Sequence, residues 1–301
     1  MDVVFESVIP ELELVTRDAV RDIYNLPQDK QLIVYTDRIT AFGYELDKPI
    51  PLRGVVLHQI SLFWIQKFAH MAGFNLVTQQ FKKYPDMLQP HEKILAGRSL
   101  IVQPLKQMPL RFRVIGNLYG EDYKTYKATE RVGGRLLPKG IQECGRLADA
   151  MLVVEPVGDM TRIDTEDMNK WAQRMYGPQN YKTLEDICLS VFGVARNYAA
   201  ARGLIIAESS FEFALFDGQP YFIGQVMTPE TTSYWPLAGF KAGQPQPDYE
   251  KQPMYDWLKA EGWKENEAMP PLTKEVVNDV MRREREIFNI MTGKVAKPTN
   301  D

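Results

Sequence analysis

The chain has 301 residues, of which 45% are hydrophobic and 25% are charged, and its formal net charge is −3. This length and composition are typical of a globular protein with a large core in one or two domains. The slight negative charge excludes a global basic surface, so we expect neither nucleic acid nor an acidic membrane as a partner.

The N-terminal part of the chain predicts one helix and three strands. Residues 31–36 form a short apolar run that ends in a polar turn, which is typical of a strand. Residues 54–73 carry apolar side chains at helical spacing and end in glycine, which predicts a helix. Residues 99–102 and 110–115 are strand-like and close in sequence, so we expect them to pair antiparallel.

The middle of the chain predicts an irregular segment followed by two helices. Residues 129–164 are rich in glycine and proline, and a helix is predicted to begin at 164 and end at 175. A longer helix is predicted over 183–203, where Thr183 and Asp186 resemble a capping box.

Three strand-like segments follow this helix directly. They have the sequences GLIIAE, FEFALF and QPYFIGQV, and Asp217-Gly218 predicts a hairpin turn between the last two. Two further helices are predicted over 251–260 and 274–292. Strands in neighbouring hairpins, with the helices grouped between them, indicate an α+β fold with mostly antiparallel sheets.

Strong chemical motifs are scarce in this sequence. His58, His70 and His91 have no metal-ligand spacing, and no glycine-rich loop has the pattern of a phosphate-binding motif. The two cysteines are far apart, which predicts reduced thiols in a cytoplasmic protein. The N-terminus has no basic segment followed by an apolar run, and no window is apolar enough for a membrane helix, so no signal peptide or membrane span is expected.

Two polar features lie at or within predicted strands. Asp37-Arg38 follows the first strand, where it could form part of a functional loop or a salt bridge that stabilises the turn. Glu212 lies within FEFALF, and strand alternation places it on the face of Ser210, opposite Phe211 and Phe213. A carboxylate is costly to bury unpaired, so Glu212 is either solvated or engaged in a site.

Several segments, taken in order, resemble the SAICAR synthetase family over roughly residues 15–292. They are VRDIY (20–24), TDRITAF (36–42), IPLRG (50–54), RSLIV (98–102), GLIIAESSFEF (203–213), MTPETTSYW (227–235) and YEKQPMYDWL (249–258). The resemblance implies a two-lobed, ATP-grasp-like α+β fold. We place the N-terminal lobe at 1–110 and the C-terminal lobe, with the sheet and the C-terminal helices, at 111–301.

The resemblance also implies an activity, namely the ATP-dependent ligation of an aminoimidazole carboxylate nucleotide to L-aspartate in purine biosynthesis. ATP and Mg²⁺ would be the cofactors, and a small molecule would bind in the cleft between the lobes. The resemblance does not indicate an oligomeric state.

The sequence departs from the family pattern at several polar positions. Asp18-Ala19 replaces Gly-Lys, whose lysine reaches the ATP phosphates, and Ser210 replaces a second lysine. Gly224-Gln225 replaces Asp-Glu, whose acids serve the metal and nucleotide. On the substrate side, the chain has Ile115, Ser233 and Tyr255 where the family pattern has arginines, and Glu121 where it has a serine. These losses predict weakened binding of polyanions.

Three hypotheses follow from this pattern: a ligase with unusual contacts, a repurposed enzyme that acts without ATP on a less anionic molecule, or a non-catalytic metabolite-binding protein. The candidate catalytic residues are Glu212, Asp37 and Arg38. The candidate substrate-binding residues are Arg21, Arg53, Arg98, Glu121, Ser210, Ser233, Tyr234, Lys251 and Tyr255. No metal ligand is predicted.

Overall fold

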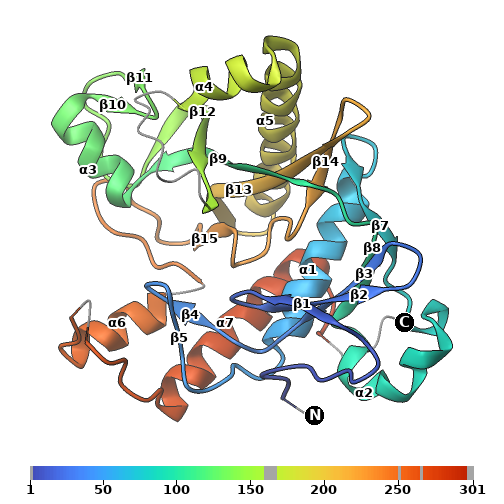
Figure 1. Ribbon diagram of the computed structural model, residues 1–301. Helices are drawn as coiled ribbons and strands as arrows, with labels where there is room; N and C mark the ends of the chain where they lie inside the picture. Colours follow the sequence, from blue (N-terminus) through green and yellow to red (C-terminus); the bar gives the residue numbers. More distant parts are fainter. Residues whose placement is uncertain (1–2, 159–167, 250–251, 265–266, 297–301) are drawn as a thin grey trace. The chain divides into compact units, whose positions relative to one another are not determined.

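The computed structural model describes residues 3–158, 168–249, 252–264 and 267–296 (Figure 1). The chain divides into two compact units, each assembled from separate segments. Unit 1 contains residues 1–63, 75–104 and 249–301, and unit 2 contains residues 64–74 and 105–248.

Unit 1 is built on a five-stranded sheet with the strand order β1-β2-β3-β8-β7, in which every neighbouring pair is antiparallel. Its strands are β1 (Leu14–Arg17), β2 (Arg21–Leu26), β3 (Lys30–Tyr35), β8 (Ser99–Val102) and β7 (Leu76–Thr78). A short hairpin follows β3 and consists of β4 (Thr40–Ala41) and β5 (Tyr44–Glu45).

The helices of unit 1 come from three parts of the sequence. They are most of α1 (Arg53–Phe68), the short turns η1 (Phe81–Lys83), η2 (Asp86–His91) and α2 (Glu92–Leu95), and the C-terminal helices α6 (Gln252–Ala260) and α7 (Lys274–Thr292). Thr273 caps α7, because its side chain accepts a hydrogen bond from the amide of Val276.

The C-terminal helices group with the N-terminal strands, whereas the predicted lobe boundary at residue 110 placed them with the following strands. The physical reason is a shared apolar core. Ile39 and Leu46, from the segment around the β4–β5 hairpin, pack with Met254 and Leu258 of α6 and with Val280 of α7. Apolar contact between distant segments therefore decides the grouping, which a single boundary in the sequence cannot express.

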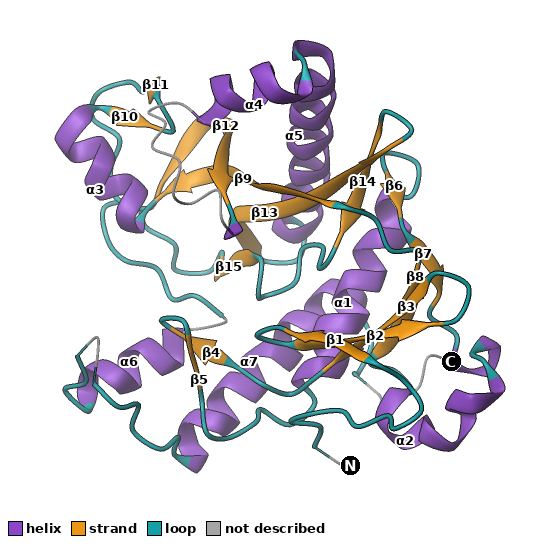
Figure 2. Cartoon of the chain, in the orientation of Figure 1, coloured by secondary structure: helices purple, strands orange, loops and turns teal. Residues whose placement is uncertain are grey.

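Unit 2 is built on a six-stranded sheet with the path β12-β9-β13-β14-β6 and with β15 paired to β13 (Figure 2). Its strands are β12 (Gly145–Pro156), β9 (Gln107–Leu118), β13 (Leu204–Phe216), β14 (Gln219–Ile223), β6 (Gly73–Phe74) and β15 (Thr232–Pro236). The β14–β6 pair is parallel and the other pairs of this sheet are antiparallel.

Two helices, α4 (Met168–Tyr176) and α5 (Pro178–Ala200), pack against the strands of this sheet. The helix α3 (Gly120–Thr129) and the hairpin of β10 (Arg131–Val132) and β11 (Arg135–Leu136) follow β9. The apolar side of β13 is buried, with Phe211 and Phe213 each no more than 1% exposed. Glu212 keeps partial exposure between them, as strand alternation predicts.

The predicted α+β class with mostly antiparallel sheets is confirmed, and so is the turn at Asp217-Gly218. Both of its residues have positive φ, and the turn joins β13 to β14 through the pair Phe216 and Gln219. The expected pairing of 99–102 with 110–115 is wrong, because β8 joins the sheet of unit 1 and β9 joins that of unit 2.

Two local predictions in the middle of the chain are also wrong. The segment 129–164 was expected to be irregular, yet it contains the long strand β12, which is stabilised by antiparallel pairing with β9. Thr183 does not begin a helix, because α5 begins at Pro178, a residue well suited to the first helical position. The Thr183 hydroxyl instead donates to the carbonyl of Gln179, one turn earlier in α5. Across the described ranges, the helices are all too short or too polar to cross a membrane.

His58 of α1 is a buried titratable group of unit 1. Its ring packs against Tyr35, with the ring centroids 5.4 Å apart, and neither ring nitrogen has a hydrogen-bond partner among the described residues. Burial, and secondarily the positive charge of Arg98, lowers the pKa of His58 from 6.5 to about 3. The folded protein therefore holds this imidazole neutral.

We predict that His58 makes the protein sensitive to acid. Because the folded pKa is below the unfolded value, its contribution to stability is complete above pH 6.5 and is lost as the pH falls toward 3. The free energy of unfolding should fall by up to about 1.4 kcal/mol per pH unit in this window. Urea titrations should show that His58→Phe flattens this dependence, whereas the exposed control His70→Phe does not. An unchanged pH dependence in His58→Phe would contradict the prediction.

Candidate functional site

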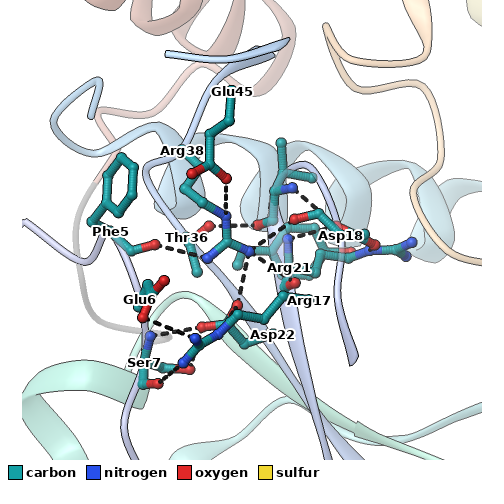
Figure 3. Close-up of polar contacts among 12 residues, drawn as sticks. Phe5, Glu6, Ser7, Arg17, Asp18, Arg21, Asp22, Thr36, Arg38 and Glu45 are labelled. Atoms are coloured by element: carbon teal, nitrogen blue, oxygen red, sulfur yellow. Dashed lines mark hydrogen bonds and ion pairs between the residues drawn. The ribbon is translucent and has the colours of Figure 1, made fainter. Parts of the chain in front are cut away.

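Arg38 is the centre of a buried polar cluster in unit 1 (Figure 3). It follows β3, and its Nη2 donates a hydrogen bond of 2.8 Å to Oδ1 of Asp22 in β2. Its Nε lies 3.4 Å from the carboxylate of Glu45 in β5. Arg38 and Asp22 are both shielded from solvent. Because an unpaired buried charge is costly, each group depends on the other.

The same guanidinium also binds three main-chain carbonyl groups. Its Nη1 donates to the carbonyl of Phe5 at 2.8 Å, and Nη2 lies 2.9 Å from the carbonyl of Asp18 and 3.0 Å from that of Arg21. Figure 3 shows these groups converging on Arg38. Arg38 thus joins the N-terminal segment to the turn between β1 and β2.

Asp37, the neighbour of Arg38, is fully buried and has its own set of partners. Its carboxylate accepts hydrogen bonds of 2.9 Å from the amides of Val4 and Gly54, and it lies 3.0 Å from Nη1 of Arg98. Asp37 therefore fixes the start of α1 to the N-terminal segment.

Arg53 extends these contacts to the C-terminal helix. It is fully buried at the start of α1, its Nε donates to the carbonyl of Arg38 at 3.1 Å, and its guanidinium pairs with Glu284 of α7. Glu284 is itself only 1% exposed. This pair connects two helices that are far apart in the sequence.

The structure therefore brings four of the predicted site residues together in unit 1, namely Asp37, Arg38, Arg53 and Arg98. Each of them has protein groups as partners, and these contacts favour the salt-bridge alternative that the sequence left open for Asp37-Arg38. Their roles in catalysis and in substrate binding stay predictions.

The other predicted residues of this unit are partly buried or lie outside the described ranges. The guanidinium of Arg21 pairs with the carboxylate of Asp18 at 2.7 Å. Tyr255 lies in α6, and its ring packs against that of Phe42 with the centroids 4.8 Å apart. Lys251 lies outside the described residues, so its predicted role stays a prediction.

A second polar cluster lies in unit 2 and surrounds Arg113 of β9. Its Nε donates to Glu155 of β12 at 2.7 Å, and its Nη1 donates to Glu208 of β13 at 2.9 Å and to Asp122 of α3 at 2.5 Å. One guanidinium thus faces three carboxyl groups. These four side chains keep between 17% and 35% exposure, so the cluster is partly buried but still reached by solvent.

Tyr119 and Ser233 extend the Arg113 cluster. Their hydroxyl oxygens lie 2.6 Å apart, within hydrogen-bond distance. Burial raises the pKa of Glu208, which the nearby Arg113 opposes, and burial together with the charge of Glu208 raises the pKa of Tyr119 well above its usual value. Tyr119 is therefore a neutral hydroxyl at physiological pH.

The remaining predicted residues of unit 2 have different surroundings. Ser210 is the direct cross-strand neighbour of Arg113, and its main-chain amide donates to the carbonyl of Thr231. The carboxylate of Glu212 lies 4.0 Å from the guanidinium of Arg111. Tyr234 is fully buried, and its hydroxyl donates to the carbonyl of Met227.

Glu121 differs from these residues, because its side chain is 85% exposed and pairs only with Lys124 one turn later among the described residues. Its predicted contact with a substrate stays a prediction, as do those of Ser210, Ser233 and Tyr234.

Arg113, Glu155 and Glu208 were not predicted as a group. A signal was present, because Arg111 and Arg113 alternate with apolar residues on one strand and Glu208 lies in another. The register that places Glu155 and Glu208 beside Arg113 depends on strand pairing, which local sequence does not specify.

Comparison with known proteins identifies the family. The sequence model described as SAICAR synthetase matches residues 14–270. The phosphoribosylaminoimidazole-succinocarboxamide synthase of Maridesulfovibrio salexigens is 32% identical over 96% of this chain and 97% of its own length. That of Geotalea uraniireducens is 33% identical over 97% of this chain and 98% of its own length. The chain belongs to the SAICAR synthetase family.

Solved structures confirm the SAICAR synthetase fold. A SAICAR synthase from Saccharomyces cerevisiae, solved in complex with SAICAR, has a TM-score of 0.88 and 25% identity and covers 98% of this chain and 99% of its own. A SAICAR synthetase in complex with ADP has a TM-score of 0.66 and 17% identity, which supports the fold alone. The likeness to ATP-grasp proteins stays a prediction.

The β1–β2 turn does not suit the nucleotide that SAICAR synthetase membership implies. The resemblance places a phosphate-binding lysine at this turn, where the chain has Asp18-Ala19. The Asp18 carboxylate accepts the amides of Val20 and Arg21, at 2.9 and 2.7 Å. The turn therefore presents a carboxylate where a phosphate would require a cation.

The end of β14 is also unlike the family pattern for a metal–nucleotide site. Gly224, with φ of 73°, has no side chain, and the amide oxygen of Gln225 accepts the hydroxyl of Thr228 at 2.9 Å. A hard cation such as Mg²⁺ is held by carboxylates, and these two positions supply none. The residues at both places therefore do not fit Mg-ATP.

We predict that the Arg38–Asp22 pair is essential to the stability of the fold. Asp22→Ala removes the buried carboxylate partner of the Arg38 guanidinium and should lower the free energy of unfolding by about 3–5 kcal/mol. A matched control is Asp186→Ala, which removes an exposed partner of Lys182 and should cost much less, because exposed ion pairs contribute little to stability. Urea unfolding measures both, and equal losses would contradict the prediction.

Proposed function

We propose that this member of the SAICAR synthetase family acts on, or binds, a small molecule that carries less negative charge than the family's nucleotides, and that it does so without ATP. The observation that carries the proposal is the Arg113 cluster of unit 2. The one guanidinium of this cluster is engaged by Asp122, Glu155 and Glu208.

Electrostatics decides which ligands such a cluster attracts. Three carboxyl groups against one guanidinium leave an excess of negative charge, which repels a phosphate and attracts an ammonium group. The hydroxyls of Tyr119 and Ser233 can donate to or accept from neutral groups. The cluster therefore suits a cationic, zwitterionic or neutral molecule.

The positions that differ from the family pattern support the same proposal. The Asp18 carboxylate accepts hydrogen bonds from the main-chain amides of the β1–β2 turn, and Gly224-Gln225 supplies no carboxylate for a metal ion. These substitutions lie in both units, and each removes a charge that would serve a polyanion. A cytoplasmic location stays a prediction.

The family ligase reaction is the second candidate function. The similarity over nearly the whole chain to relatives that are named phosphoribosylaminoimidazole-succinocarboxamide synthases favours it. In that case the chain would join an aminoimidazole carboxylate nucleotide to L-aspartate and would bind Mg-ATP by contacts that differ from the family pattern.

One pair of measurements separates the two functions. We predict that calorimetric titration of the purified protein with Mg-ATP gives a dissociation constant in the millimolar range or weaker. We also predict no phosphate release from ATP in the presence of the aminoimidazole carboxylate nucleotide and L-aspartate. Micromolar binding of Mg-ATP, with phosphate released for each amide formed, would establish the ligase and overturn the proposal.

The same preparation tests the charge of the ligand. Thermal shift measurements against a panel of amines, amino acids, nucleosides and phosphorylated metabolites should give stabilising compounds among the first three classes. Glu208→Gln, which removes one carboxylate of the Arg113 cluster, should weaken stabilisation by amines. Stabilisation confined to phosphorylated compounds would contradict the proposal.

A further inference from the structure

The main-chain carbonyl groups of the turn between β1 and β2 accept hydrogen bonds that hold the turn in shape. The carbonyl of Val20 accepts hydrogen bonds from the amide and the hydroxyl of Thr36, at 2.8 and 3.0 Å. The carbonyls of Asp18 and Arg21 lie within 3.0 Å of Nη2 of Arg38. Thr36 and Arg38 are both buried, so this support belongs to the core of unit 1 (Figure 3).

The donors of the turn converge on one carboxylate. The amides of Val20 and Arg21 donate to Oδ1 of Asp18 at 2.9 and 2.7 Å. Nε of Arg21 donates to Oδ2 of the same side chain at 2.7 Å. Successive main-chain N–H groups that converge in this way form a concave anion site, and the guanidinium adds a positive charge to it.

We propose that the Asp18 carboxylate is a built-in anion, which occupies an anion-binding site in the β1–β2 turn and excludes the phosphate group of an external molecule. The latent site would take a phosphate, held by the two amides and by Arg21. This inference deepens the proposed function, because it names the contact by which this turn rejects a polyanion.

Asp18 does more here than an aspartate at an ordinary turn. In an Asx turn the side chain accepts the amide two residues later, as it does here from Val20. The additional amide and the guanidinium of Arg21 complete a three-donor set that one carboxylate fills.

The turn has the support to keep its shape without this carboxylate. The amide of Asp18 donates to the carbonyl of Arg21 at 2.9 Å, and Thr36 and Arg38 hold the carbonyl groups. The Asp18 side chain is 34% exposed, so an ion from solvent can reach the same donors. Removal of the carboxylate should therefore leave a preformed and accessible anion site.

The test uses the full chain and sodium tripolyphosphate as the probe. Calorimetry should show that Asp18→Ala binds tripolyphosphate at least about tenfold more tightly than the wild type, because charged hydrogen bonds replace like-charge repulsion. The double variant Asp18→Ala, Arg21→Ala is the matched control and should lose most of this gain. Equal affinity in the wild type and in folded Asp18→Ala would overturn the proposal.

A second variant keeps the proposal testable if Asp18→Ala does not fold. Asp18→Asn retains an oxygen that can accept the two amides but removes the negative charge, so it should fold and show a smaller gain in tripolyphosphate affinity. No gain in folded Asp18→Asn would then overturn the proposal. Because these titrations contain no ATP, nucleotide or aspartate, their failure is distinguishable from the failure of the proposed function, which the ligase assay measures.

Discussion

The buried guanidinium of Arg38 is the interaction on which the polar architecture of unit 1 depends. It pairs with Asp22 and binds carbonyl groups of the N-terminal segment and of the β1–β2 turn. The carbonyl of Arg38 accepts a hydrogen bond from Arg53, whose guanidinium pairs with Glu284 of α7. A charge with so many protein partners stabilises the fold only while every partner is in place, since removal of one leaves the others buried and unpaired. The orientation of the turn that presents Asp18 follows from this constraint.

In both units, arginine side chains form ion pairs with carboxylates of the same chain. In unit 1 Arg98 pairs with Asp37 and Arg21 pairs with Asp18, and in unit 2 Arg113 faces three acids. An arginine that is paired in this way cannot attract a phosphate without exchanging one anion for another. Membership of the SAICAR synthetase family accounts for the fold, whereas the placement of charge is the basis of the proposed ligand with less negative charge. The scaffold and its chemistry are separable, because fold alone does not decide function.

The sequence predicted those elements whose signals are local. The helical spacing of 54–73 corresponds to α1 (Arg53–Phe68), and 274–292 corresponds to α7 (Lys274–Thr292). The turn at Asp217-Gly218 was predictable because both of its positions require positive φ, which these residues tolerate. The strand β12 was not predictable from its own residues, because its hydrogen bonds to β9 supply the stability that the Gly- and Pro-rich segment lacks locally.

The candidate site was only partly predictable for a related reason. Asp37 and Arg38 were predicted as site residues because they directly follow β3. Only the structure shows that the partners of Asp37 are Val4 and Arg98 and that the partner of Arg38 is Asp22, all of them remote in sequence. The Arg113 cluster depends on the register of three strands and on α3, so no short segment contains its signal. Asp18 was recognised as an acid in an unexpected position, whereas its hydrogen bonds to the turn became visible only in three dimensions.

The most direct measurement of the central claim is a crystal structure of the protein grown with a high concentration of Mg-ATP. The account predicts that the Asp18 carboxylate remains bound to the amides of Val20 and Arg21 and that no phosphate lies at the β1–β2 turn. A phosphate bound to these amides, with Asp18 rotated away and a magnesium ion beside Gln225, would contradict it.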